Sequence, residues 1–381
     1  MIPFNKPHLT GKETHYIYDA VNTGKISGNG KYTRMCQDYL KERYNFGKCL
    51  LTTSCTDALE MAALLIDIKP GDEVIMPSYT FVSTANAFVL RGAKIIFADS
   101  RKDHPGIDED SIEALITSKT KAIVPVHYAG VACDMDKIME LADKYNLFVI
   151  EDAAQAIESF YTGKDGIKRA LGSIGHLAAF SFHETKNIIS GEGGMLAIND
   201  PQFMAKAEII WEKGTNRSAF FRGEVDKYGW VAVGSSFLPS EIIAAFLWSQ
   251  LENLDDIQAK RLQHWNMYHE GLKEWAIVNN IYLPGIPDFA TNNAHMFYLV
   301  CKDLEQRMEL IEKLKSKGIL AVFHYLSLHK SPFYKDKYTG KNLPNTDRFT
   351  DCVVRLPFYY DLGIDTINFI NNELQEAVKN I

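Results

Sequence analysis

The chain has 381 residues, of which 46% are hydrophobic and 23% charged, as in ordinary globular proteins. Its net charge of −7 offers no basic surface for nucleic acid or for an anionic membrane. No run is long and apolar enough to span a membrane, the start lacks the apolar region of a signal peptide, and the six cysteines show no C-x-x-C spacing. We therefore expect a cytoplasmic protein with free thiols, no metal site, and no nucleic-acid or membrane partner.

Short apolar runs alternate with helical stretches through the first half of the chain. The runs predict seven strands, at Cys49–Thr52, Glu73–Pro77, Lys94–Ala98, Ala122–His127, Leu147–Glu151, Ala178–Phe182 and Gly194–Ile198. Helices are expected between them, for example at Asp57–Ile66, Asp136–Lys144 and Pro201–Glu212. This alternation predicts an α/β fold with a seven-stranded, mostly parallel sheet that is covered on both faces.

The pattern changes near Asn253 to longer helices with sparse strands, such as Ala294–Val300 and Ala321–Tyr325. We expect a large domain over residues 1–252 and a smaller C-terminal α+β domain over residues 253–381. In a largely parallel sheet, ligands bind at the carboxyl ends of the strands. Functional residues are therefore expected just after the apolar runs.

The first such position is Ser54-Cys55-Thr56, where a strand gives way to a helix. The free N–H groups and the dipole of a helix N-terminus favour a phosphate group, and the hydroxyls of Ser54 and Thr56 add donors. The same residues are also typical of a simple helix cap.

Asp152 and Gln155 follow the predicted strand Leu147–Glu151. An ionised carboxylate at the end of a buried strand is costly without a partner, and a protonated pyridine nitrogen is one suitable partner. Gln155 could then bond a hydroxyl on the same ring. The alternative is that Asp152 only caps the helix after it.

Lys186 follows the predicted strand Ala178–Phe182, close to the turn at Gly193-Gly194. A partly desolvated lysine at this position has a lowered pKa and can act as a nucleophile and later as a base. Ser181 could add a phosphate contact. The alternative is an ordinary solvated lysine in a loop.

Phe81 lies in the string Pro77–Thr84, after another predicted strand. Its ring could lie against the face of an aromatic ligand, although aromatic residues in such positions often belong to the core.

In this order, the motifs closely resemble the sugar aminotransferases of the DegT/DnrJ/EryC1/StrS family, which are pyridoxal 5′-phosphate (PLP) enzymes of fold type I. The resemblance extends from Gly24 to Pro357 and is most specific in Pro77–Thr84, Pro125–Gly130, Glu151–Gln155 and Ser181–Asn187. It implies that Lys186 holds PLP as a Schiff base, that Asp152 pairs with the pyridine nitrogen and that Gln155 contacts the ring hydroxyl. It further implies phosphate contacts from Thr56 and Ser181, and ring stacking by Phe81.

Four strings look like one branch of that family: Ser54-Cys55-Thr56, Phe182–Asn187, Glu212–Ser218 and Val322–Tyr325. This branch moves the amino group of L-glutamate to C4 of dTDP-4-dehydro-6-deoxy-D-glucose, giving 2-oxoglutarate and dTDP-4-amino-4,6-dideoxy-D-galactose. The nucleotide sugar is expected between the loop Ser27–Asn29 and the segment Phe323–His329. Its contacts are expected from Ser27, Asn29, Tyr325 and His329. His127 and His183 are interpreted as pocket residues or, equally, as structural histidines.

The resemblance also implies a homodimer with its sites at the subunit interface. Many family members carry G-Y-N-x-R where this chain has Gly234–Leu238, and the Asn of that motif reaches the phosphate in the neighbouring site. Ser236 is too short for this contact, so Asn216 or Arg217 is the candidate replacement.

Several other functions stay open at this point. Amination at C3, or at C4 with an equatorial product, would use the same cofactor residues, and a non-catalytic PLP-binding regulator is a further alternative. A dehydratase of this fold would carry histidine in place of Lys186, and a nicotinamide enzyme would carry G-x-G-x-x-G after its first strand.

Overall fold

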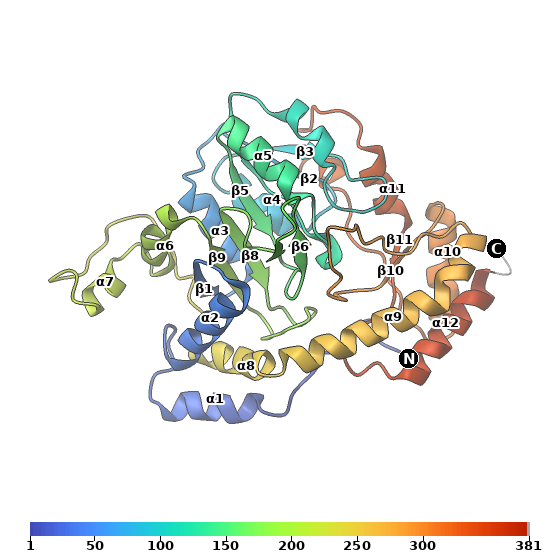
Figure 1. The fold of residues 1–381 in the computed structure, drawn as a ribbon, viewed down its shortest axis with the longest axis horizontal. Coiled ribbons are helices and arrows are strands. Elements are labelled where there is room, and N and C mark those ends of the chain that lie inside the picture. Colours follow the sequence, from blue (N-terminus) through green and yellow to red (C-terminus); the bar gives the residue numbers. More distant parts are fainter. Residues whose placement is uncertain (379–381) are drawn as a thin grey trace.

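The computed structural model describes residues 1–378 (Figure 1), and its centre is a sheet of seven strands. These strands are β1 (Lys48–Thr52), β2 (Glu73–Pro77), β3 (Lys94–Ala98), β4 (Thr120–Ile123), β5 (Phe148–Asp152), β8 (Leu177–Ser181) and β9 (Gly194–Ile198). Their order is β1-β9-β8-β5-β4-β2-β3. All neighbours are parallel except β9, which runs antiparallel to both β1 and β8. The predicted seven-stranded, mostly parallel sheet is confirmed.

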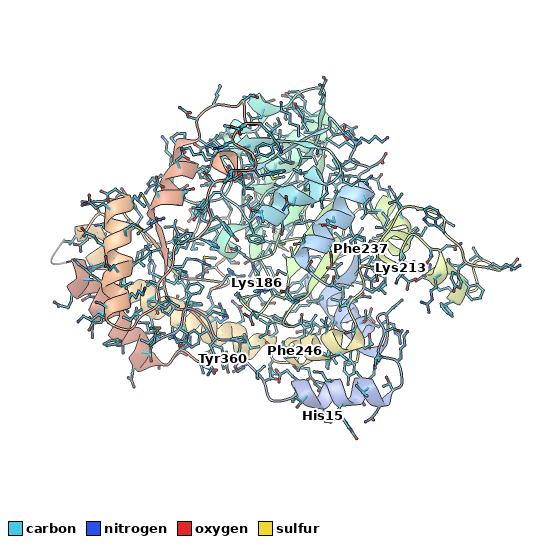
Figure 2. The ribbon with its side chains drawn as sticks, turned by 180° about the vertical axis from the view of Figure 1, so that it is seen from behind. His15, Lys186, Lys213, Phe237, Phe246 and Tyr360 are labelled. Carbon is cyan, nitrogen blue, oxygen red and sulfur yellow. The ribbon has the colours of Figure 1, made fainter. Side chains whose placement is uncertain are left out.

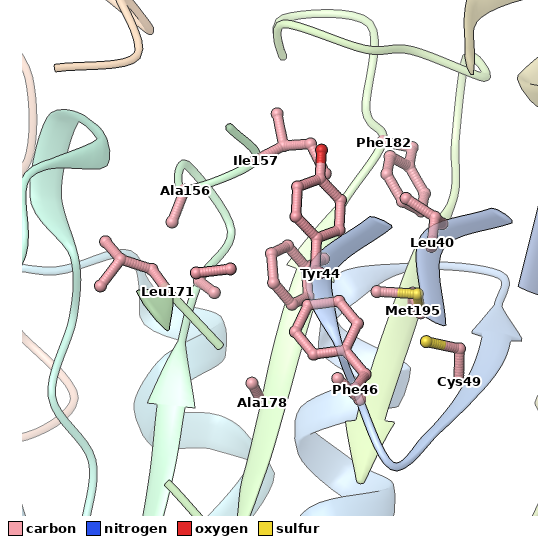
Figure 3. Packing of buried hydrophobic residues seen from close by; sticks show 14 of the residues in the cluster. Leu40, Tyr44, Phe46, Cys49, Ala156, Ile157, Leu171, Ala178, Phe182 and Met195 are labelled. Carbon is pink, nitrogen blue, oxygen red and sulfur yellow. The ribbon is translucent and has the colours of Figure 1, made fainter. Parts of the chain in front are cut away.

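Helices cover both faces of this sheet, because the strands are apolar on both sides. Alternate residues of one strand enter different cores: Leu51 lies in the core beneath α2 and α5, and Leu50 lies in the core beneath α3, α4 and α6. The helices are α2 (Lys31–Tyr44), α3 (Cys55–Leu65), α4 (Val82–Val89), α5 (Met135–Tyr145) and α6 (Met204–Trp211). Figure 3 shows the first core, where Tyr44 and Phe46 pack over β8 close to Met195 and Cys49.

A second body of structure follows the long helix α9 (Leu254–Val278). It contains the two-stranded sheet β10 (Tyr298–Val300) and β11 (Val353–Arg355), with α10 (Leu304–Ser316), α11 (Pro344–Cys352) and α12 (Ile364–Val378) around it. A third hydrophobic core forms mostly from these elements. The boundary at residue 252 stays a prediction.

The remaining elements extend the large body. The helices are α1 (Glu13–Asn22), α7 (Arg217–Phe221) and α8 (Glu241–Leu251), and the strands β6 (Phe160–Thr162) and β7 (Lys168–Ala170) form a small hairpin that the sequence pattern did not reveal. α7 stands at the tip of an arm that projects away from the rest of the molecule (Figure 1). Within residues 1–378, no helix combines the length and the apolar character needed to cross a membrane.

Two predicted strands of the C-terminal part are wrong in extent. The segment predicted at Ala321–Tyr325 forms only one bridge, between Val322 and Arg355. The strand predicted at Ala294–Val300 begins only at Tyr298, because the carbonyl groups of Ala294 and His295 accept hydrogen bonds from the Arg261 guanidinium instead of a neighbouring strand.

The N-terminal residues pack on the C-terminal part of the chain. Ile2 pairs with Ile319, and the carbonyl of Phe4 accepts a hydrogen bond from the amide of Phe358. These contacts bring the first residues of the chain beside the strand ends of the large sheet.

Candidate active site

A cavity of about 440 Å³ opens between the carboxyl ends of the strands and the C-terminal part of the chain. Figure 2 shows Lys186 near the centre of the molecule, between the sheet and the C-terminal helices. Nine of the predicted site residues line this cavity: Ser54, Cys55, Thr56, Phe81, Asp152, Gln155, Ser181, Lys186 and Tyr325. Eight of these residues follow or end strands of the large sheet, and Tyr325 is added from the C-terminal part, which is why residues far apart in sequence meet here.

Asp152 is the last residue of β5 and is buried, with 5% of its surface exposed. Thr84 Oγ1 donates to its Oδ2 at 2.7 Å, and the amide of Ala154 donates to its Oδ1 at 3.1 Å. Burial raises the pKa of Asp152, while these two hydrogen bonds and the Lys186 charge oppose that rise. A cation brought into contact with this carboxylate would therefore be strongly favoured.

Lys186 lies in the turn after β8, where its amide donates to the His183 carbonyl at 2.9 Å. Burial lowers the pKa of its ammonium group, and the neighbouring Cys55 and Asp152 partly offset that effect. The next residue, Asn187, anchors the turn, because its side-chain amide donates to the carbonyl of Asn293 at 2.8 Å and its oxygen lies 2.9 Å from His295 Nδ1. The nucleophile is thus held on a fixed backbone.

The helix α3 begins at Cys55, directly after β1, and directs its N-terminus at the cavity. Ser54 is its N-cap, and its Oγ accepts from the amide of Asp57 at 3.1 Å. Thr56 Oγ1 donates to Ser83 Oγ at 2.7 Å. The helix-cap interpretation of Ser54 is confirmed. The phosphate contact stays a prediction, which the position of the helix N-terminus at the cavity favours.

Glycine is required where β9 passes this helix end. A Cβ atom on Gly194 would overlap the backbone of Ser54 and Cys55, so any other residue would push the strand and the helix apart. Ser181 pairs with Gly194 at the end of β8 and lines the cavity beside it.

Aromatic and amide groups form the opposite wall. Phe81 exposes 55% of its surface, and its ring centre lies 6.1 Å from that of Tyr325. Gln155 accepts from the amide of Ala129 at 2.6 Å and donates to the Tyr325 hydroxyl at 3.0 Å. One N–H of the Gln155 side chain is left for a ligand.

Three predicted contacts do not line this cavity. His329 is buried beside β2, where its Nδ1 lies 2.8 Å from Ser78 Oγ and its Nε2 lies 3.6 Å from Asp347. Ser27 is exposed in the loop before α2. Asn29 adopts a left-handed backbone with φ of 61° in the same loop, and its side chain lies near Glu212.

His127 is both a pocket residue and a structural histidine, the two interpretations that the sequence left open. It lines the cavity, and its Nε2 lies 2.9 Å from Oε2 of Glu151, with both side chains fully buried. Glu151 also accepts the amides of Gly172 and Gly175, so this carboxylate is held firmly beneath the site.

Sequence reasoning missed three residues that complete the cavity, namely Thr84, His295 and Arg355, and it included His324 only as part of the segment Phe323–His329. Thr84 carried a usable signal, because it closes the string Pro77–Thr84 that follows β2. Arg355 carried none, because a single arginine on a short strand of another part of the chain is unremarkable.

The assembled groups fit PLP. Lys186 would offer the amine for the cofactor's aldehyde, Asp152 a carboxylate for its ring nitrogen, α3 an N-terminus for its phosphate, and Phe81 a ring for its face. When bound, PLP supplies an electron sink for charge that develops on the substrate carbon.

This fold and this site define a PLP-dependent transferase of fold type I. The chain belongs to the DegT/DnrJ/EryC1/StrS aminotransferase family, whose profile matches residues 7–375, and it is thus a sugar aminotransferase with pyridoxal 5′-phosphate as its cofactor.

Comparisons with known proteins extend over the whole chain. The spore coat polysaccharide biosynthesis protein SpsC of Bacillus subtilis (strain 168) is 31% identical over 390 residues, covering 99% of this chain and 97% of that protein. The aminotransferase from Psychrobacter cryohalolentis has a TM-score of 0.91 at 27% identity, with 100% of both chains covered. DesV of S. venezuelae, solved in complex with a ketimine intermediate, has a TM-score of 0.90 at 28% identity, covering 100% of this chain and 99% of that one.

Proposed function

We propose that the protein transfers the amino group of L-glutamate to C4 of dTDP-4-dehydro-6-deoxy-D-glucose, giving dTDP-4-amino-4,6-dideoxy-D-galactose. The observation that carries the aminotransferase chemistry is that Lys186, Asp152 and the N-terminus of α3 line one cavity. The choice of sugar rests on the resemblance of Phe182–Asn187, Glu212–Ser218 and Val322–Tyr325 to the branch with that activity. The name of the relative SpsC, a polysaccharide biosynthesis protein, agrees with a nucleotide-sugar substrate.

The residues of the cavity divide the work of this reaction. The uncharged amine of Lys186 is the nucleophile for the cofactor and, once free, removes the proton from Cα of the donor. Asp152, fixed by Thr84 and Ala154, holds a proton on the ring nitrogen as charge develops. Lys186 then returns a proton to C4 of the sugar, from the side that sets the configuration of the product.

We further infer that the working enzyme is a cytoplasmic homodimer. The arm around α7 carries exposed apolar side chains, with Phe221 69%, Trp230 82% and Val233 63% exposed. This arm projects away from the rest of its own chain (Figure 1). Such a surface is typical of a subunit contact. Arg217 at the start of α7, with its guanidinium over the Phe221 ring, then reaches toward the phosphate in the partner's site. Ser27 and Asn29, which lie outside their own chain's cavity, would also serve the partner's site.

The product decides between the candidate substrates. Purified enzyme is incubated with PLP, L-glutamate and dTDP-4-dehydro-6-deoxy-D-glucose, and the product is solved by NMR. An axial amine at C4 supports the proposal. An equatorial amine at C4 would contradict the assigned product while leaving an aminotransferase, and amination at C3 in a parallel incubation with the 3-keto isomer would favour that alternative.

A non-catalytic regulator is tested by the first half of the reaction alone. Adding L-glutamate to the PLP-bound protein is expected to change the absorbance to that of pyridoxamine phosphate. A protein that only binds PLP would keep its original spectrum.

A further inference from the structure

Arg355, at the end of β11, brings a guanidinium group into the cavity from the C-terminal part of the chain. Its backbone is fixed on both sides, because its amide donates to the carbonyl of Val322 at 2.7 Å and its carbonyl accepts from the amide of Val322 at 3.0 Å. Val322 begins the string Val322–Tyr325, which also supplies His324 and Tyr325 to the cavity. The position of the arginine is therefore defined by the same backbone that places two other cavity residues.

This guanidinium has no acidic partner within residues 1–378. It takes part in no salt bridge, its Nε is buried without a hydrogen-bond acceptor, and its Nη2 has only the carbonyl of Phe323 at 3.4 Å. The ring of Phe4 packs against it, with the ring centre 4.6 Å from Cζ. A planar group with five donors is thus held in a partly buried place with most of its hydrogen-bonding capacity unused.

Burial makes this arrangement unfavourable for the protein alone. It lowers the pKa of Arg355, and the nearby hydroxyl groups of Tyr79, Tyr128 and Tyr325 only partly offset this effect. A buried cation without a counter-ion is destabilising, so residues that are kept in this state usually meet their counter-ion in a ligand.

We propose that Arg355 binds a carboxylate of the amino donor and so selects it, a step that rests on the proposed function. The flat fork of a guanidinium matches the two oxygens of a carboxylate. Arg355 and Lys186 line the same cavity, so a ligand bound to the guanidinium can lie beside the reacting amine. The α-carboxylate of an amino acid is one bond from the reacting carbon.

The other oxyanions of the reaction fit this position less well. The cofactor phosphate is accounted for by α3 and Ser181, on the side of the large sheet. The diphosphate of a nucleotide sugar is attached at C1, across the sugar ring from C4. The donor carboxylate is the oxyanion that must approach Lys186 most closely.

The experiment separates the two halves of the reaction in Arg355→Met and Arg355→Lys. In the first half, PLP-bound enzyme is titrated with L-glutamate and the absorbance change is followed. We expect the half-saturating glutamate concentration to rise about 100-fold in Arg355→Met and less in Arg355→Lys, as for loss of a charge-assisted bidentate contact. In the second half, enzyme loaded directly with pyridoxamine phosphate is mixed with the keto-sugar, and its rate is expected to stay near that of the unmodified enzyme.

Binding of glutarate, a dicarboxylate that cannot react, provides a readout that is independent of catalysis. Calorimetry on the PLP-bound protein should show glutarate binding that Arg355→Met abolishes. The matched control is Arg348→Met, since Arg348 lies on the neighbouring α11, contacts the Lys102 carbonyl and does not line the cavity. This control should bind glutarate normally.

Unchanged glutamate and glutarate binding in Arg355→Met would overturn the proposal. A selective loss of the second half-reaction would also overturn the proposal, because that result would assign Arg355 to the diphosphate of the nucleotide sugar. If the unmodified enzyme fails to react with glutamate, the proposed function is wrong, and glutarate binding still decides whether Arg355 recognises a carboxylate. If Arg355→Met does not fold, Arg355→Lys, which keeps the charge, replaces it in both experiments. The expected result is then weaker binding of glutamate and glutarate than in the unmodified enzyme.

Discussion

Burial of Lys186 makes its ammonium group easier to deprotonate. Its pKa is lowered from the usual 10.5, so a larger fraction of the amine is uncharged at pH 7 than for a solvated lysine. Because only the uncharged amine attacks the cofactor, the rate of PLP attachment should rise with pH and level off below pH 10.5. Stopped-flow absorbance measures this rate, and Nα-acetyl-lysine is the control. A rate that keeps rising to pH 10.5, as for the control, would contradict the expectation.

Asp152 and Thr84 allow a paired test of ring protonation. Asp152→Asn keeps the shape and removes the charge, and we expect the rate of the glutamate half-reaction to fall about 100-fold or more. Thr84→Val keeps the Asp152 charge and removes the hydrogen bond to Oδ2, together with the one between the Thr84 and Thr80 hydroxyls, so a smaller loss is expected. Single-turnover absorbance measures both variants. Equal effects of the two changes would argue that Asp152 acts by packing and not through its charge.

The main functional residues were predictable because each follows an apolar run that ends at the same edge of the sheet. Lys186 and Asp152 also stand in strings that are specific to one family. Arg355 was not predictable, because the two-stranded sheet of β10 and β11, elsewhere in the chain, places it. The predicted role of His329 as a sugar contact lacks support in one chain, since its ring is turned to Ser78 and Asp347.

At the level of elements, the contact between β9 and the start of α3 shapes the end of the cavity proposed to hold the phosphate. Gly194→Ala should move the two elements apart, weaken PLP binding and lower the free energy of unfolding by about 1–3 kcal/mol, as for overpacking in a core. PLP titration and urea unfolding of the cofactor-free protein measure the two effects. The control Gly285→Ala, where a Cβ atom meets only Asp103 at an ordinary 3.6 Å, should change neither. Normal PLP affinity in Gly194→Ala would show that this contact does not shape the phosphate end.

The strands of the large sheet were predictable to within a few residues, since apolar runs buried on both faces leave a strong pattern. The largest difference is at β4, which ends at Ile123, although Val126 still forms a parallel bridge with Asp152 beyond Pro125. The hairpin β6–β7 and the irregular segment around Ala294 were not predictable. Their backbones are fixed by long-range hydrogen bonds, such as those from Arg261, which leave no local pattern.

At the level of the whole molecule, the proposed homodimer is tested by mixing two inactive variants. Lys186→Ala lacks the nucleophile, and Arg217→Ala lacks the group proposed to reach the partner's phosphate. A mixed dimer has one site with both residues intact, so random mixing should restore about a quarter of the unmodified activity. Activity is measured after subunit exchange, with each variant alone as the control. Full PLP affinity in Arg217→Ala, or no recovery on mixing, would remove this role for Arg217.

The contact of the N-terminal residues with the C-terminal part could not be predicted, because Ile2 and Ile319 lie at opposite ends of the sequence. This contact brings Phe4 against Arg355, so one wall of the cavity is made from the first and the last parts of the chain.

That arrangement has a consequence for synthesis on the ribosome. Arg355 follows Lys186 by roughly 170 residues, which corresponds to roughly 10 to 35 s at ordinary translation rates. During this interval the strands that carry Lys186 and Asp152 are already outside the exit tunnel, while the wall formed by β11 does not yet exist. A nascent chain can therefore bind PLP before Arg355, the residue proposed to select the amino donor, has been synthesised.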